Sequence, residues 1–176
     1  MSLGSKWWRK PMRFNRSKLH ASSRIHNAGS LKSPREPILG RVLSTKITSH
    51  RSFRNALASM VAHSLHGEMD PAPLCSLLVE VAEEPYESGG PSAAAVSFAD
   101  LSSIHLRDPA CEGLVHAFLN FKGFKALAAH RLAHVLWREN RREVALAIQA
   151  RCSEVYGVDI HPAAKIGAGN HSMEPF

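Results

Sequence analysis

Histidine side chains give the first candidate for a chemical site. His130 and His134 are four residues apart, a spacing that places both imidazoles on one face of a helix and can hold zinc. The residue after His130 is Arg131 rather than a glutamate, and no third ligand is evident. We therefore interpret both histidines as structural and predict no metal ion. Arg131 and Trp137 could equally build a contact between helices, with the guanidinium stacked or hydrogen-bonded.

Two aspartates give the second candidate. Asp108 precedes a proline, which is the pattern of a helix N-cap, so capping alone explains it and a short helix is predicted to begin there. Asp159 comes just before Ile160, which is six residues from Ile166. This step is the period of a hexapeptide parallel β-helix, although such a solenoid needs about three repeats to be stable. By spacing alone, Asp159 is a turn residue.

A series of helices must position these residues. Apolar residues at steps of three and four predict amphipathic helices over 53–65 and 74–81, and Asp70 caps the second of them. Two glycines and a proline at 89–91 break the pattern, and 92–106 predicts a weaker, alanine-rich helix.

Two longer helices are predicted after these. The apolar residues of 121–135 follow the helical period, and those from Val144 to Val155 continue it beyond the basic turn at 138–142. A short turn makes the two helices antiparallel. No alternating apolar pattern of strand length occurs before residue 155, so the predicted fold class is an all-α helical domain over 36–157.

The positive charge of the chain is concentrated at its beginning. Of the 22 lysines and arginines, nine lie within residues 1–35, which contain no aspartate or glutamate. This tail is rich in serine and poor in aliphatic residues, so it cannot bury enough apolar area to offset chain entropy. We predict that it is disordered, whereas the rest of the chain is close to neutral.

Three interpretations of the basic tail stay open. It is a solvated leader, or an organelle transit peptide, which is typically rich in arginine and serine and poor in acids. Alternatively, Trp7 and Trp8 beside Arg9 and Lys10 contact nucleic acid by stacking near phosphates. We favour the leader and do not expect nucleic acid as a partner. The predicted compartment is the cytoplasm, with a plastid or mitochondrion as the alternative.

The sequence disfavours two classes of protein, membrane-spanning and secreted. No apolar run approaches the roughly 20 residues of a membrane-spanning helix, and the apolar core of a secretory signal is missing near the start. We therefore expect neither a membrane protein nor a secreted one. Cys75, Cys111 and Cys152 are widely spaced and form no Cys-x-x-Cys pair, so they are predicted to be reduced thiols.

Five sequence blocks together resemble serine O-acetyltransferase, especially its plant form. They are ITSHRS (47–52), RDPAC (107–111), FKGFKALAAHRLAHVLW (121–137), NRR (140–142) and VDIHPAAKIGAG (158–169). The resemblance covers roughly residues 36–169, about three quarters of the chain, and the two longest blocks are highly specific in this order.

The resemblance implies a helical domain that leads into a left-handed parallel β-helix. Residues 158–169 would be its first coil, and 170–176 a divergent tail. The family forms trimers through the β-helix and pairs them into hexamers through the helical domains, so a homo-oligomer is implied. The family's C-terminal tail docks into O-acetylserine thiol-lyase and ends in isoleucine rather than in Phe176, so this partner is not expected here.

The resemblance also implies a reaction and two site residues. The family transfers the acetyl group of acetyl-CoA, a co-substrate rather than a tightly bound cofactor, to the serine hydroxyl in the first step of cysteine biosynthesis. Asp108 matches an aspartate that helps to hold serine, and whose site cysteine can occupy as a feedback inhibitor. Asp159 matches the aspartate that orients the catalytic histidine. A positioned histidine is suited to take the proton of the serine hydroxyl.

That histidine belongs to an Asp-His-Ala-Thr-Gly stretch that does not occur in this sequence. The further coils that form the acetyl-CoA cleft are not found either. His171 lies outside the matching residues, and we interpret it as a tail histidine rather than a substitute base. Two functions are therefore expected: a truncated serine O-acetyltransferase family member that is inactive alone, or a non-catalytic helical assembly module that docks onto full-length family subunits.

Overall fold

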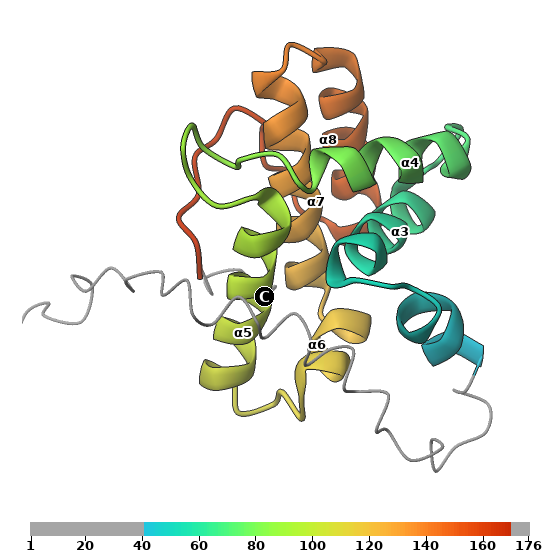
Figure 1. Cartoon of the computed structure of the whole chain (residues 1–176), viewed down its shortest axis with the longest axis vertical. Helices are drawn as coiled ribbons and strands as arrows, with labels where there is room; N and C mark the ends of the chain where they lie inside the picture. Colours follow the sequence, from blue (N-terminus) through green and yellow to red (C-terminus); the bar gives the residue numbers. More distant parts are fainter. Residues whose placement is uncertain (1–40, 170–176) are drawn as a thin grey trace, which may run out of the picture.

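The computed structural model describes residues 41–169, which form an α-helical domain (Figure 1). Within this range there is no strand, and the one isolated bridge pairs Pro85 with Ser92. The predicted all-α fold class is thus confirmed for the described residues. The basic tail 1–35 and His171 lie outside them.

The helical elements are, in chain order, η3 (Ser44–Thr48, a π-helix), α3 (Phe53–Leu65), α4 (Pro71–Val81), α5 (Ala93–Arg107), α6 (Leu114–Asn120), α7 (Lys122–Arg138) and α8 (Arg142–Tyr156).

Side-chain caps begin three of these helices. Asp70 accepts the N–H of Ala72 at 3.0 Å, which confirms the predicted start of α4. Ser92 caps α5 in the same way, through the N–H of Ala95 at 3.3 Å, and Ser52 caps α3. These short polar side chains satisfy backbone donors that have no partner within the first turn of a helix.

Helix α7 lies at the centre of the domain. It contacts α3, α4, α5, α6 and α8, and its residues are buried around most of its circumference. Leu57, Leu78, Leu101, Leu132 and Ile148 are fully buried, each on a different helix. Because α7 has little exposed surface, its polar residues must find partners inside the protein.

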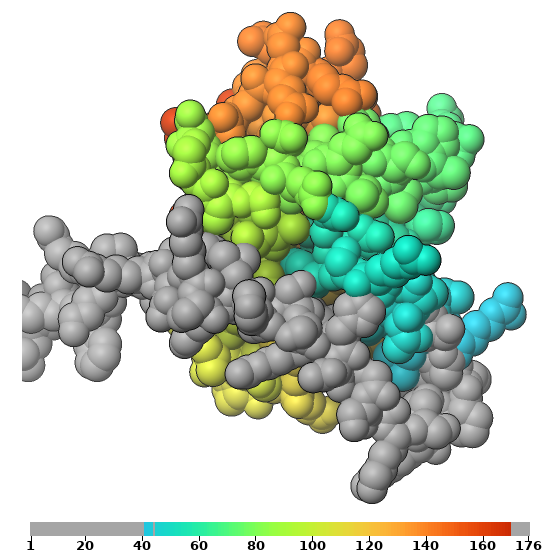
Figure 2. All heavy atoms as spheres, viewed as in Figure 1, coloured from blue at the N-terminus to red at the C-terminus, as the bar shows by residue number. Residues whose placement is uncertain are grey.

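Helix α8 covers the predicted range, but the last residue of its apolar series does not lie in the core. Val155 is 37% exposed, whereas Tyr156 packs against the core. At 3.6 residues per turn, the position 11 residues after the buried Ala145 returns to the same face, and that position is 156. The turn before α8 projects at one end of the molecule, in orange in Figure 2.

Residues 158–169, here called the strap, follow α8. Gly157 ends the helix in a left-handed conformation, with φ of +71°. The strap contains turns and no strand, and it returns to α5, beside which it is drawn in red in Figure 1. That it forms the first coil of a β-helix stays a prediction. Among residues 41–169, no helix combines the length and apolar character required to cross a membrane.

Candidate functional site

Asp108 ends α5 instead of starting a helix. Its backbone N–H donates to the carbonyl of Ile104 at 2.9 Å, and its carboxylate accepts the N–H of Ala110 at 2.8 Å. The next helix begins only at Leu114, so the predicted helix at Asp108 is wrong. Gly113 precedes this helix with extended backbone, at φ of 164°.

The Asp108 carboxylate has the character of a cation-binding group. The side chain is half-buried in the loop after α5, and the bond to Ala110 fixes one of its oxygens. Oδ2 has no hydrogen-bond partner among residues 41–169. A fixed carboxylate with a free oxygen can accept charge-assisted hydrogen bonds from an ammonium group.

Asp159 lies on the strap and is held from α8. The side-chain amide of Gln149 donates to Asp159 Oδ1 at 2.6 Å. Asp159 is exposed, and no hydrogen bond or ion pair within the described range joins it to Asp108. The structure therefore places the two predicted site residues on separate elements, without direct contact.

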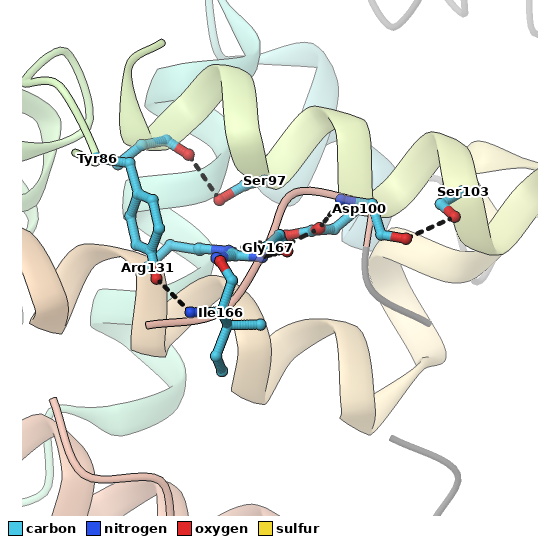
Figure 3. Close-up of polar contacts among 9 residues, drawn as sticks. Tyr86, Ser97, Asp100, Ser103, Arg131, Ile166 and Gly167 are labelled. Carbon is cyan, nitrogen blue, oxygen red and sulfur yellow. Dashed lines mark hydrogen bonds and ion pairs between the residues drawn. The ribbon is translucent and has the colours of Figure 1, made fainter. Parts of the chain in front are cut away.

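A buried ion pair between α5 and α7 is the most developed polar arrangement in the domain. Arg131 Nε donates to Asp100 Oδ2 at 3.0 Å, and Nη2 donates to Oδ1 at 3.2 Å. The side chains of Arg131 and Asp100 are 0% and 1% exposed. The guanidinium also lies over the ring of Tyr86, 4.6 Å from its centroid (Figure 3). The helix contact predicted for Arg131 is thus confirmed.

The same ion pair binds the strap. Arg131 donates to the carbonyl of Gly167 at 2.7 Å and to that of Ile166 (Figure 3). Gly169 is held through both backbone groups: its N–H donates to Asp100 Oδ1 at 2.7 Å, and its carbonyl accepts the Ser103 hydroxyl at 3.1 Å. Side chains of α5 and α7 thus supply the partners that a neighbouring strand would give to this backbone.

The loop between α4 and α5 covers the strap from another side. The Tyr86 hydroxyl accepts the N–H of Ile166 at 3.3 Å, and Glu87 lies 3.9 Å from the ammonium of Lys165. Arg138 holds this loop by donating to the carbonyls of Pro85 and Tyr86 at 2.8 and 2.7 Å. The strap is therefore in contact with α5, α7 and this loop, while Lys165 on its other side is exposed.

His130 and His134 also face the strap. His134 Nδ1 donates to the carbonyl of Pro162 at 2.7 Å, which assigns the proton to this nitrogen, while Nε2 lies 3.4 Å from Glu87. Burial, together with the charges of Arg131 and His134, lowers the pKa of His130 from 6.5 to about 4. The backbone of Ala164 acts in the opposite direction and raises the pKa of His130. Neither ring nitrogen of His130 makes a full hydrogen bond within the described residues.

His130 is therefore a neutral side chain beside the strap at neutral pH. Within the described residues, no group of three or more His, Cys, Asp or Glu side chains is arranged to hold a metal ion. The three cysteines are free, and burial raises the pKa of Cys152 to about 12 and also raises that of Cys75. Burial thus disfavours the thiolate at both positions.

Asp100 is the site residue that sequence reasoning missed. The available signal is a carboxylate on the face of α5 that also carries Val96, Leu101 and Ile104, all of which are buried. A charged residue on such a face is costly unless a partner neutralises it. The sequence does not reveal that partner, because Arg131 is 31 residues away.

Comparison with known proteins identifies relatives of this domain. The family model described as "Serine acetyltransferase, N-terminal" matches residues 23–129. Serine acetyltransferase 1, chloroplastic, of Arabidopsis thaliana is 47% identical over 135 residues, which are 76% of this chain and 41% of that protein. The chain therefore spans about two fifths of the length of this relative.

Solved structures of the same kind share the fold. A soybean serine acetyltransferase complexed with serine superposes with a TM-score of 0.69 at 37% identity, covering 84% of this chain and 58% of that one. A serine acetyltransferase in complex with CoA gives a TM-score of 0.75 at 31% identity, covering 86% and 64%.

Proposed function

Because this chain belongs to the serine acetyltransferase family, we propose that it forms the helical domain of an acyltransferase that moves the acetyl group of acetyl-CoA to the hydroxyl of L-serine. The observation that carries the proposal is the family match over residues 23–129, which includes Asp108. Similar enzymes have been solved with serine and with CoA, which supports both substrates. The product would feed cysteine biosynthesis.

Asp108 is the residue proposed to bind serine. Its fixed carboxylate, with a free Oδ2, suits the ammonium group of an amino acid. The bond to the Ala110 N–H holds the side chain in place before substrate arrives, so less side-chain entropy is lost on binding. Cysteine carries the same ammonium and is therefore proposed to compete for the site at Asp108 as a feedback inhibitor.

The reaction also requires a base and a carbonyl acceptor. The serine hydroxyl loses its proton to a histidine as its oxygen attacks the thioester carbonyl, and the CoA thiolate leaves and is protonated to the thiol. Asp159 is proposed to orient that histidine, and the strap to be the first coil of the β-helix that carries it. The required histidine stretch does not occur among these 176 residues. The polypeptide alone is therefore expected to show no turnover.

Two assays test this proposal. Release of CoA from acetyl-CoA and serine should be absent for the 176-residue chain, and turnover at rates typical of the family would contradict the expectation. Titration with serine, followed by NMR, should move signals around Asp108 in the wild-type chain. The variant D108N should weaken serine binding by about tenfold or more, because it removes the charge that pairs with the ammonium.

D70N is the matched control for D108N. Asp70 and Asp108 both begin the tripeptide Asp-Pro-Ala, and both accept the N–H of the alanine, at 3.0 and 2.8 Å. D70N should therefore reproduce the local cost of the substitution and leave serine binding unchanged. Equal serine affinity in D108N and D70N would remove Asp108 from the proposed binding site.

A second candidate function is that of a non-catalytic assembly module. Leu106 is the residue chosen to test it, because this large apolar side chain at the end of α5 is 78% exposed in the isolated chain and would leave water if α5 lay in an assembly interface. The chain should then form homo-oligomers through the helical domain, or co-elute with an intact homologue in size-exclusion chromatography, and L106S should weaken both. Failure to co-elute with the homologue would exclude docking onto full-length subunits.

The proposed compartment is the cytoplasm, with a plastid or mitochondrion as the alternative. The similar Arabidopsis thaliana enzyme is described as chloroplastic, which supports the transit-peptide interpretation of the tail. A fluorescent protein fused after residue 40 tests this, because a transit peptide would direct the fusion to the plastid or mitochondrion. A fluorescent signal confined to the cytosol would favour the solvated leader.

A further inference from the structure

The buried ion pair between Arg131 and Asp100 contributes more to the arrangement of the elements that it joins than to the stability of the fold. The side chains are 0% and 1% exposed, so both charges lose nearly all contact with water. That desolvation offsets most of their attraction, and apolar residues of similar volume often make a protein equally stable. What a buried ion pair can supply instead is one defined arrangement of the elements that it joins.

Arg131 joins three elements at one point. It lies on α7 and donates to both oxygens of Asp100 on α5, and to the carbonyls of Ile166 and Gly167 on the strap. Its rigid planar fork makes these bonds possible together, whereas a lysine ammonium has the charge without the fork. The position of the strap is thus tied to the crossing of two helices.

Helix α5 relates this point to Asp108. Asp100 and Ser103 hold the two backbone groups of Gly169, and Asp108 ends the same helix five residues after Ser103. At 1.5 Å per residue, five residues span about 7.5 Å along the helix axis. The chain beyond Gly169 therefore starts at a set distance from Asp108.

We propose that Arg131 and Asp100 are a positioning pair, which fixes the strap against α5 and so sets where the chain beyond Gly169 starts relative to serine bound at Asp108. Neither residue is catalytic, because both are enclosed by protein groups. The role of Asp108 in this inference rests on the proposed function, whereas the docking of the strap does not.

The first test removes the pair and keeps the core apolar. In the full chain carrying R131M and D100L, the thermal midpoint should stay within a few degrees of wild type, because the ion pair is exchanged for packing. The N–H of Ile166 should exchange with solvent at least about tenfold faster, although its acceptor, the Tyr86 hydroxyl, is retained. Unchanged exchange at Ile166 in the folded variant would overturn the proposal.

The variant R131K separates charge from geometry. Lysine keeps the positive charge beside Asp100 but cannot reach both Asp100 and the strap carbonyls with one planar group. Exchange at Ile166 should therefore stay fast in R131K. Slow exchange restored by lysine would mean that charge alone docks the strap, and would overturn the positioning role of the guanidinium.

Two serines give a matched pair that leaves the charges untouched. Ser103 and Ser97 are both buried on α5, but Ser103 donates to the strap at Gly169 whereas Ser97 donates to Ala93 within its own helix. S103A should speed exchange at Gly169 about fivefold, for one lost hydrogen bond, and S97A should leave it unchanged. Equal exchange in the two variants would count against the proposal even if R131M/D100L does not fold.

A distance measurement tests the position itself. Spin labels at Leu106 and Lys165, which are 78% and 77% exposed, report the separation of the end of α5 from the strap. With Cys75 and Cys111 changed to serine, the distance distribution should be narrow in the parent chain and broad in R131M/D100L. An equally narrow distribution in both would refute positioning.

The experiments distinguish failure of the proposed function from failure of the positioning role. If the wild-type chain does not bind serine, the role of Asp108 fails while the exchange and distance results still decide the docking of the strap. D108N should leave exchange at Ile166 unchanged, since Asp108 does not contact the strap among the described residues.

Discussion

Arg131 of α7 and Asp100 of α5 are 31 positions apart in the sequence and form two hydrogen bonds, of 3.0 and 3.2 Å, inside the domain. Tyr86 covers the guanidinium at 4.6 Å from its ring centroid. In such a site of low dielectric, each charge depends on its counter-ion, and removing one leaves the other buried without that counter-ion.

Removing only the arginine should therefore be far more harmful than removing the pair. R131A leaves the Asp100 carboxylate buried without its counter-ion and should lower the free energy of unfolding by about 3–5 kcal/mol. R131M/D100L should stay within about 1–2 kcal/mol of wild type. Urea denaturation followed by circular dichroism measures both values, and a loss below about 1 kcal/mol in R131A would show that water or another group pairs with Asp100.

The stability of the domain should fall in acid because of His130. Its pKa is lowered from 6.5 to about 4 by burial and by the charges of Arg131 and His134, so the unfolded chain binds a proton at a higher pH than the folded one. The stabilisation is complete above pH 6.5 and is lost as pH falls toward 4. The total loss is about 3 kcal/mol, at 1.36 kcal/mol per pKa unit.

The variant H130L isolates this effect, because leucine does not titrate. Its unfolding free energy should change less between pH 6.5 and pH 4 than that of wild type, in parallel urea titrations. The same pH slope in H130L and wild type would assign the acid sensitivity to other groups.

The left-handed C-cap of α8 should require glycine. Gly157 has φ of +71° and an added Cβ would meet nothing within 4 Å, so G157A tests backbone strain alone. We expect a loss of about 1–2 kcal/mol in unfolding free energy. G167A is the control, because Gly167 has equal space and no positive φ. Equal stability of the two variants in thermal denaturation would contradict this assignment.

The N-cap of α5 should contribute measurably to stability. Ser92 accepts the N–H of Ala95 at 3.3 Å, and S92A should cost about 1 kcal/mol. The control is S76A. The Ser76 hydroxyl donates to the carbonyl of Ala72 inside α4, so its replacement by alanine should be neutral or slightly stabilising. Differential scanning calorimetry compares the two, and a neutral S92A would show that the cap does not stabilise α5.

Two identical tripeptides show that a capping sequence alone does not decide whether a helix forms. Asp-Pro-Ala at 70–72 and at 108–110 makes the same hydrogen bond from aspartate to alanine. Only the first starts a helix, because Leu74, Leu78 and Val81 follow it with a buried face. After 108–110 no such face follows before Gly113, so the same local signal ends in a loop.

The candidate site was predictable only in part. Asp108 and Asp159 were identified from motifs, yet the motifs contain no information on the Gln149 that holds Asp159. Arg131 was predicted to contact another helix, and it does so through Asp100. No sequence pattern predicted that Arg131 would also bind the strap, because that contact depends on how the segment after α8 folds back.

Periodicity and capping residues in the sequence by themselves predicted α3, α4, α5, α7 and α8, because these signals act over a few residues, and five motif blocks indicated the family. The same local signals placed a helix at Asp108 instead of α6. Tertiary structure alone decided that α7 is central and that Asp100 and Ser103 meet Gly169. The physical reason is that a buried charge or carbonyl accepts whichever partner the folded chain brings to it, and a separation of more than 60 residues leaves no local trace of that choice.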